Sequence, residues 1–185
     1  MNSRLRTILT SAIVLFVLSG VCVAQKPNGS DSEASCRTFV QAFYDWYAPI
    51  AQRDDIGTTS DYALKERPEV FTARLYKALK ADSEAQHRSK ELVGLDFDPF
   101  LNSQDPSPQF IVDSVTVKQN QCLAAVYGLN NGQREESVKP ELEMSDGRWQ
   151  FVNFHYYDQK LGDYDLLSIL RQNAYDRQGH PIHQR

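Results

Sequence analysis

The sequence predicts one α+β domain: N-terminal helices packed on a curved four-stranded antiparallel sheet, followed by a short C-terminal helix. Hydrophobic residues recur every three or four positions in the first half of the chain and every two positions in the second half. No segment with the composition of a linker separates the two halves. A length of 185 residues also suits one domain with a sizeable core.

The composition excludes two broad classes of protein. With 20 basic and 24 acidic residues, the chain lacks the basic excess that nucleic-acid binding requires, so no nucleic-acid partner is expected. A hydrophobic content of 41% is too high for a disordered chain.

The first 24 residues have the pattern of a secretory signal peptide. Arg4 and Arg6 form a basic start, residues 8–21 form an apolar run, and small residues precede a cleavage site after Ala24. We therefore expect a periplasmic or secreted protein. The mature chain would carry a net charge of −6, from 18 basic and 24 acidic residues.

Two other interpretations of this segment are less favoured. An uncleaved membrane anchor needs about 20 apolar residues, and this run is shorter, so no membrane span is expected after cleavage. Lipidation of Cys22 needs a small residue before the cysteine, where this chain has Val21.

The mature chain retains Cys36 and Cys122. Two cysteines in an exported chain have one possible pairing, so we expect a disulfide between them. The alternative is two buried free thiols. A catalytic cysteine is not expected, because no histidine lies in a known local signature around either residue.

The first half of the mature chain predicts two helices. Residues 25–35 are polar and predict a flexible leader; a helix then starts at Cys36, with Ser35 as its N-cap, and stops near Pro49. Its buried stripe consists of Cys36, Phe39, Val40, Phe43, Tyr47 and Ile50. Residues 52–62 predict a loop.

A second helix is expected to begin near Pro68 and to fray at residues 82–85. His87, at or just after this polar end, is expected to be an exposed surface residue. Residues 94–106 have lost the helical period; they predict an ordered loop whose aromatic side chains enter the core.

Four strands follow, at residues 110–118, 122–129, 137–144 and 149–158. Pro140 places the third strand at a sheet edge or at a bulge. Strict alternation in the last strand places one set of side chains on a single face: Trp149, Phe151, Asn153, His155 and Tyr157.

Asp163 is predicted to cap a closing helix that contains four apolar residues between positions 166 and 170. The domain would then span residues 36–176, and residues 177–185 would form a loose tail.

Several segments together resemble a known family. These are the aromatic run at residues 43–47, the stretch from Asp96 through residues 97–100 to Asp105, and residues 146–149 before the last strand. They resemble the bacterial exported proteins of domain-of-unknown-function family 3828, which are related to the cone-shaped nuclear transport factor 2-like superfamily. The resemblance covers residues 36 to about 172. It implies a pocket between sheet and helices that binds small apolar ligands, catalyses isomerisation or dehydration, or is filled and purely structural.

Three carboxylates on one loop, Asp96, Asp98 and Asp105, form the first candidate site. Oxygen ligands of this kind suit Ca²⁺, but their spacing does not match an EF-hand loop. Asp residues beside proline more often cap turns, and that interpretation is favoured here. A polar contact to a ligand at the mouth of the pocket is a third use. Calcium at this loop is the one cofactor considered.

His155 is the second candidate, with Tyr157 beside it. If the face that carries them lines the pocket, His155 could act as a general acid or base oriented by Asp113 or Tyr157. A single histidine without a visible partner is more often structural, and that interpretation is favoured.

These observations predict a non-enzymatic exported domain that binds a small molecule or a protein partner of the cell envelope at the concave sheet face. One alternative is a small isomerase or dehydratase that uses His155 with an Asp. Another is an envelope or immunity-type interaction protein with a filled core.

Overall fold

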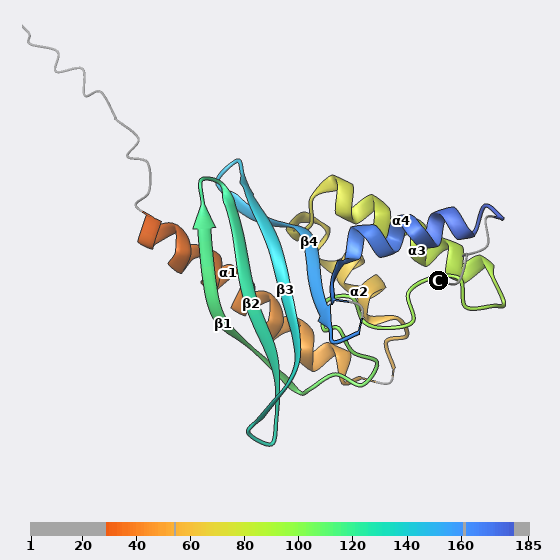
Figure 1. Ribbon diagram of the computed structural model, residues 1–185, viewed down its shortest axis with the longest axis horizontal. Helices are drawn as coiled ribbons and strands as arrows, with labels where there is room; N and C mark the ends of the chain where they lie inside the picture. Colours follow the sequence, from red (N-terminus) through yellow and green to blue (C-terminus); the bar gives the residue numbers. More distant parts are fainter. Residues whose placement is uncertain (1–28, 54, 161, 180–185) are drawn as a thin grey trace, which may run out of the picture.

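The computed structural model describes residues 29–53, 55–160 and 162–179. Figure 1 shows an antiparallel sheet with α1 across one face and α3 and α4 beside its β4 side. The predicted α+β class is therefore confirmed. The proposed signal peptide and the cysteine at position 22 lie outside the described residues. Within the described ranges, no helix is both long and apolar enough to cross a membrane.

The first helix, α1 (Gly29–Ala51), begins earlier than expected. Residues 29–35, predicted as part of a flexible leader, are helical. Their polar composition hid this, because the helix is stabilised by the buried stripe further along. Asp31 in the first turn also interacts favourably with the helix dipole. Residues 25–28 lie outside the described part of the chain.

Two further elements differ from prediction. Helix α2 (Thr59–Glu66) occupies part of the expected loop 52–62. At Pro68 the chain forms only a 3₁₀ turn, η1 (Pro68–Val70), and α3 (Ala73–Arg88) follows after a new cap at Thr72. The helix cannot run through Phe71, because this residue is extended and bridges to Phe151 of the sheet.

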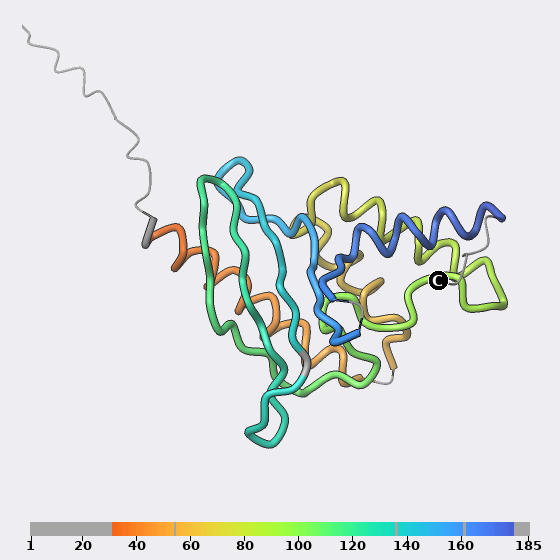
Figure 2. Tube along the Cα trace, viewed as in Figure 1, coloured from red at the N-terminus to blue at the C-terminus, as the bar shows by residue number. Residues whose placement is uncertain are grey.

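The sheet has five strands in the order β1-β2-β3-β4-β5 among the described residues, not four. The four expected strands are confirmed: β1 (Gln109–Lys118), β2 (Gln121–Asn130), β3 (Gln133–Ser145) and β4 (Arg148–Asp158). The missed strand, β5 (Gly162–Asp165), has no apolar alternation and depends on pairing with the end of β4. Helix α4 (Leu166–Asp176) follows, capped by Asp165 and not by Asp163. Figure 2 shows the β2–β3 hairpin reaching beyond the helices.

A bulge at Val152 makes the predicted alternation of β4 wrong. Glu141 pairs with Asn153 and Leu142 pairs with Phe151, so Val152 is an extra residue. Trp149 and Phe151 are buried before the bulge; Phe154 and Tyr156 are buried after it. His155 and Tyr157 therefore point to the outer face, away from the helices. Strand β3 is internal, so Pro140 does not mark an edge; it lies next to this bulge instead.

Aromatic side chains fill the space between the sheet and the helices. The ring of Phe43 lies 4.8 Å from that of Phe151 and 5.3 Å from that of Tyr47, and all three side chains are buried. Phe100, from the loop before β1, packs 5.1 Å from Phe154. The inner face of the sheet is thus a packed core.

Candidate functional site

The loop before β1 brings Asp98 inward. Its Oδ1 accepts hydrogen bonds from the backbone N–H groups of Phe100 and Leu101, at 2.9 and 3.2 Å. Its Oδ2 accepts a 2.6 Å hydrogen bond from the Tyr47 hydroxyl. The backbone of Asp98 also bonds to Ser103. Asp98 therefore uses its oxygens to close a turn, as the favoured interpretation expected.

Burial raises the pKa of Asp98 to about 6, although its hydrogen bonds to Tyr47 and the backbone oppose the shift. Burial, with the nearby Asp98, raises the pKa of Tyr47 well above its ordinary value, so the phenol remains a donor. Asp98 is consequently a carboxyl group whose charge changes in a mildly acidic solution.

The other two carboxylates do not join Asp98. Asp96 and Asp105 are exposed, on either side of the turn that Asp98 closes. Among the described residues, no group of three or more His, Cys, Asp or Glu side chains is placed to hold a metal ion. The geometry gives no support to a calcium site at this loop.

Asp96 lines an open groove between the start of α2, the C-terminal half of α3 and the loop 92–106, which we call the loop groove. It consists of a hollow of about 590 Å³ and an adjoining hollow of about 80 Å³. Both hollows are lined by Thr58, Ser60, Leu95 and Phe97. The larger one falls in the volume range of small-molecule sites.

Sequence reasoning missed one pair of ionisable side chains in this groove. His87 Nε2 lies 2.9 Å from Asp61 Oδ2, which joins the end of α3 to the start of α2. His87 is exposed, as predicted, with 66% of its side chain accessible. Only the unpredicted helix α2 brings Asp61 within reach, so no local motif could have indicated the pair.

The second candidate residues lie elsewhere, on the outer face of the sheet. His155 Nε2 lies 2.9 Å from Glu141 Oε2 on the neighbouring strand. The proposed partner Asp113 instead pairs with Arg134, at 3.0 Å. Tyr157 is 59% exposed. The sequence could not indicate Glu141, because the register of β3 and β4 decides this contact.

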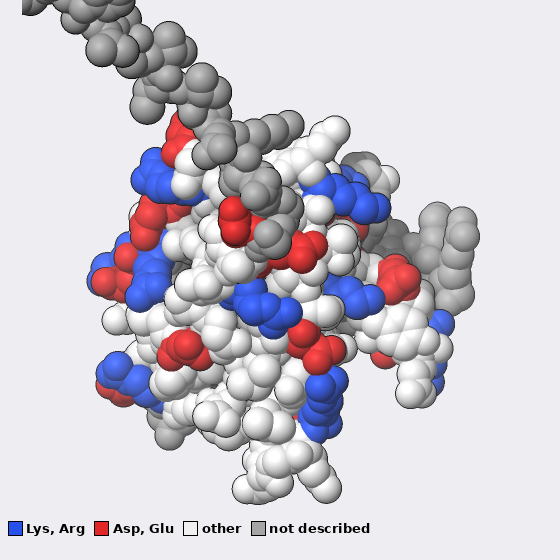
Figure 3. Space-filling model, turned by 90° about the vertical axis from the view of Figure 1, so that its left-hand side faces the viewer, with Lys and Arg blue, Asp and Glu red and all other residues white. Residues whose placement is uncertain are grey.

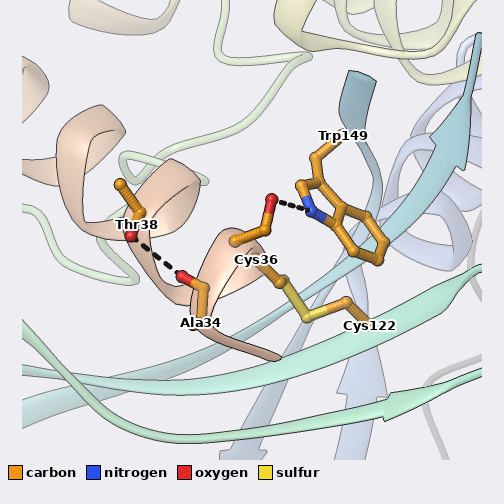
Figure 4. The surroundings of a disulfide bond; sticks show 6 residues. Ala34, Cys36, Thr38, Cys122 and Trp149 are labelled. Atoms are coloured by element: carbon orange, nitrogen blue, oxygen red, sulfur yellow. Dashed lines mark hydrogen bonds between the residues drawn. A yellow bond between two sulfur atoms is a disulfide. The ribbon is translucent and has the colours of Figure 1, made fainter. Parts of the chain in front are cut away.

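The expected disulfide between Cys36 and Cys122 is confirmed, and both residues are buried. It joins α1 to β2 beside the indole of Trp149, whose Nε1–H donates to the Ser35 hydroxyl at 3.2 Å (Figure 4). Its buried position makes this disulfide a structural cross-link.

No family model matches the chain, and no curated protein matches it. Among solved structures, it is similar to a crystal structure of a protein of unknown function from Bacteroides thetaiotaomicron. The two are 16% identical, with a TM-score of 0.45, over 68% of this chain and 92% of that one. At this TM-score the likeness says nothing further about the fold or the function. Membership of domain family 3828 stays a prediction.

Proposed function

We propose that the protein is an exported, non-catalytic binding domain and that its small-molecule ligand lies in the loop groove. Export rests on the signal-like sequence of residues 1–24 and on the disulfide, a bond typical of oxidising compartments. The inner face of the sheet, the binding surface first expected, is packed with aromatic side chains.

The observation that carries the proposal is the mixed lining of the loop groove. Leu92, Leu95 and Phe97 give it an apolar side, and 66% of Leu92 is exposed. Asp96 and the hydroxyls of Thr58 and Ser60 give it a polar side with negative charge. This combination favours a small molecule with an apolar body and an amine.

The enzyme alternative gains little from the geometry. His155 and Glu141 lie on the outer face, in a hollow of about 380 Å³ that Thr116, Lys118 and Leu123 also line. General acid–base catalysis needs a second ionisable group aimed at the substrate. Among the described residues that line this hollow, Lys118 is the one ionisable side chain besides the paired His155 and Glu141.

The proposal is tested by a thermal-shift screen of amphipathic amines, each paired with its neutral amide. Binding to the native state alone stabilises by about 2.7 kcal/mol at a hundredfold excess over Kd. We expect amines to shift the melting temperature more than amides, and Asp96→Asn to remove the difference.

Asp146→Asn serves as the matched control, because Asp146 is an exposed carboxylate in the β3–β4 turn, outside the groove lining. Equal shifts for Asp96→Asn and Asp146→Asn would contradict the proposed site. Turnover of a substrate that is lost in His155→Ala would favour the enzyme instead.

A further inference from the structure

Helices α3 and α4 lie side by side and run in the same direction away from the sheet (Figures 1 and 2). Arg177, at the C-terminal end of α4, joins it to the middle of α3, because its Nη1 donates to Asp82 Oδ1 at 2.6 Å. Asn173 contacts the same carboxylate oxygen at 3.4 Å. The two helices therefore form a fixed pair.

Between them is a shallow, open groove of about 230 Å³, which we call the arginine groove. Its apolar floor is formed by Ala78, Ala81, Leu167, Leu170 and Ala174, and its rim by Arg74, Arg171 and Arg177. It shares no lining residue with the loop groove. The small floor residues allow another backbone to approach closely.

Two of the rim arginines have no acidic partner in the described structure. Arg177 is bound to Asp82, but Arg74 and Arg171 are exposed and form no ion pair with a described residue. Three other basic residues of α3 do pair: Lys80 and Arg88 lie near Glu84, and His87 lies near Asp61. The two exposed guanidinium groups at this groove are therefore available to acidic groups of a partner.

Charge is otherwise mixed over the surface that Figure 3 shows. On that side, where β1 lies, basic and acidic side chains are interspersed. The arginine groove differs from that surface, because the charged side chains on its rim are all basic and surround an apolar floor.

We infer that the arginine groove binds a helix of a partner protein that carries Asp or Glu on one face. The groove between two parallel helices can accommodate a third helix, and guanidinium groups bind carboxylates through paired hydrogen bonds. Arg74 and Arg171, on the two opposite helices, would then each hold an acidic residue of the partner helix.

The size and charge of the groove favour this partner over two others. Its volume lies below the usual range of about 300–1,000 Å³ for small-molecule pockets. Attachment to an anionic membrane commonly uses clusters of about four to eight basic residues, and here only two are unpaired. A helical protein segment matches both the shallow floor and the two cations.

The test is selection from a display library of helical peptides of about 15 residues, with alanine and leucine fixed on one face and the other positions varied. The bait is the oxidised protein. We expect enrichment of Asp and Glu at helical spacing, and at least about tenfold weaker binding to Arg74→Gln/Arg171→Gln. Raised salt should weaken binding to the unmodified protein.

Lys139→Gln/Lys160→Gln is the matched control, because it removes two exposed positive charges from the sheet side. Both double variants are first checked for an unchanged melting temperature. No enriched peptide, enrichment without acidic residues, or equal weakening in both variants would overturn the inference. Binding to vesicles with anionic phospholipid that is lost only in Arg74→Gln/Arg171→Gln would overturn it in favour of a lipid surface.

Discussion

Hydrogen bonds from single polar side chains join the long loop before β1 to helix α1 and strand β4. Asp98 receives bonds from Tyr47 and from its own turn, while the hydroxyls of Tyr44 and Tyr156 donate to the carbonyls of Phe100 and Pro99. The loop groove is built on this loop, so its shape depends on these buried bonds. The ionisation of Asp98 should therefore be visible in stability.

A pKa of about 6 in the folded chain exceeds the ordinary value of 3.8 for an aspartate. Such a group binds its proton more tightly when folded, so its stabilising contribution is complete below pH 3.8 and is lost as the pH rises through about 6.

Asp98→Asn keeps an oxygen acceptor but cannot titrate. Between acid and neutral pH, we expect its unfolding free energy relative to wild type to rise by roughly 1–3 kcal/mol. Urea unfolding of both proteins across this pH range measures the difference in unfolding free energy. A difference that stays constant with pH would contradict the prediction.

A second set of side-chain hydrogen bonds joins α3, α4 and the segment after α3. Arg177 donates to Asp82 and to the carbonyl of Val93, so it belongs to the folded domain and not to a loose tail. Asp82 Oδ2 accepts from the backbone N–H of Leu95. A side chain at Gly94 would place its Cβ 2.9 Å from that oxygen, so any larger residue there would displace the Asp82 carboxylate from its bonds.

Removing Arg177 leaves a buried carboxylate without its cation. Only 4% of the Asp82 side chain is exposed, so Arg177→Gln should lower the unfolding free energy by roughly 2–4 kcal/mol. Arg88→Gln, which disrupts an exposed pair with Glu84, should change it by less than about 1 kcal/mol. Chemical denaturation of both variants checks this, and similar losses would count against the buried pair.

At the scale of elements, α1 covers part of an exposed strand edge. Within the described part of the chain, β2 is the one strand that pairs with β1. Arg37 donates to the carbonyls of Val112 and Asp113, and Gln41 bonds to the carbonyl of Phe110 and the N–H of Val112. A bulge near Asp113 interrupts the edge as well. Both features oppose pairing with another chain.

Arg37→Ala/Gln41→Ala should expose this edge. We expect a loss of about 1–2 kcal/mol in unfolding free energy, because partly buried backbone groups lose their hydrogen-bond partners. We also expect concentration-dependent self-association, measured by sedimentation velocity. Thr38→Ala, one position from Arg37 on the same helix, should remain monomeric if the wild type does. An unchanged sedimentation profile for the double variant would refute the protective role.

For the whole molecule, the disulfide links the helical half to the sheet. Cys36 and Cys122 are separated by 86 positions, so the bond closes a loop that contains the rest of α1 after Cys36, α2, α3, the whole loop before β1, and β1 itself. Cross-linking such a long loop restricts the unfolded chain strongly.

Cys36→Ser/Cys122→Ser should lower the unfolding free energy by roughly 2–5 kcal/mol while the native fold persists. Urea unfolding of the oxidised wild type and of the variant measures the difference, and the intact mass of the wild type checks that the bond has formed. A loss below about 1 kcal/mol, or a mass equal to that of two free thiols, would contradict the assignment.

What sequence reasoning predicted depended on local pattern. The four long strands, the helix around Phe43 and the pairing of the cysteines were all indicated by hydrophobic period or by composition. Helices and strands without a regular spacing of hydrophobic residues were missed. Helix α2 is mostly polar, and β5 is a strand only because β4 lies beside it.

The sequence by itself determined the α+β class, the order of the four long strands and the disulfide partners. It favoured a turn-closing role for all three carboxylates of the loop before β1, and the structure shows that role for Asp98. Only the tertiary structure decided which side chains share a surface. One extra residue at Val152 moves His155 to the outer face beside Glu141. Side-chain direction in a strand reverses at every residue, so a single insertion undoes any alternation counted along the chain. The loop groove and the arginine groove likewise join residues distant in sequence, which only packing brings together.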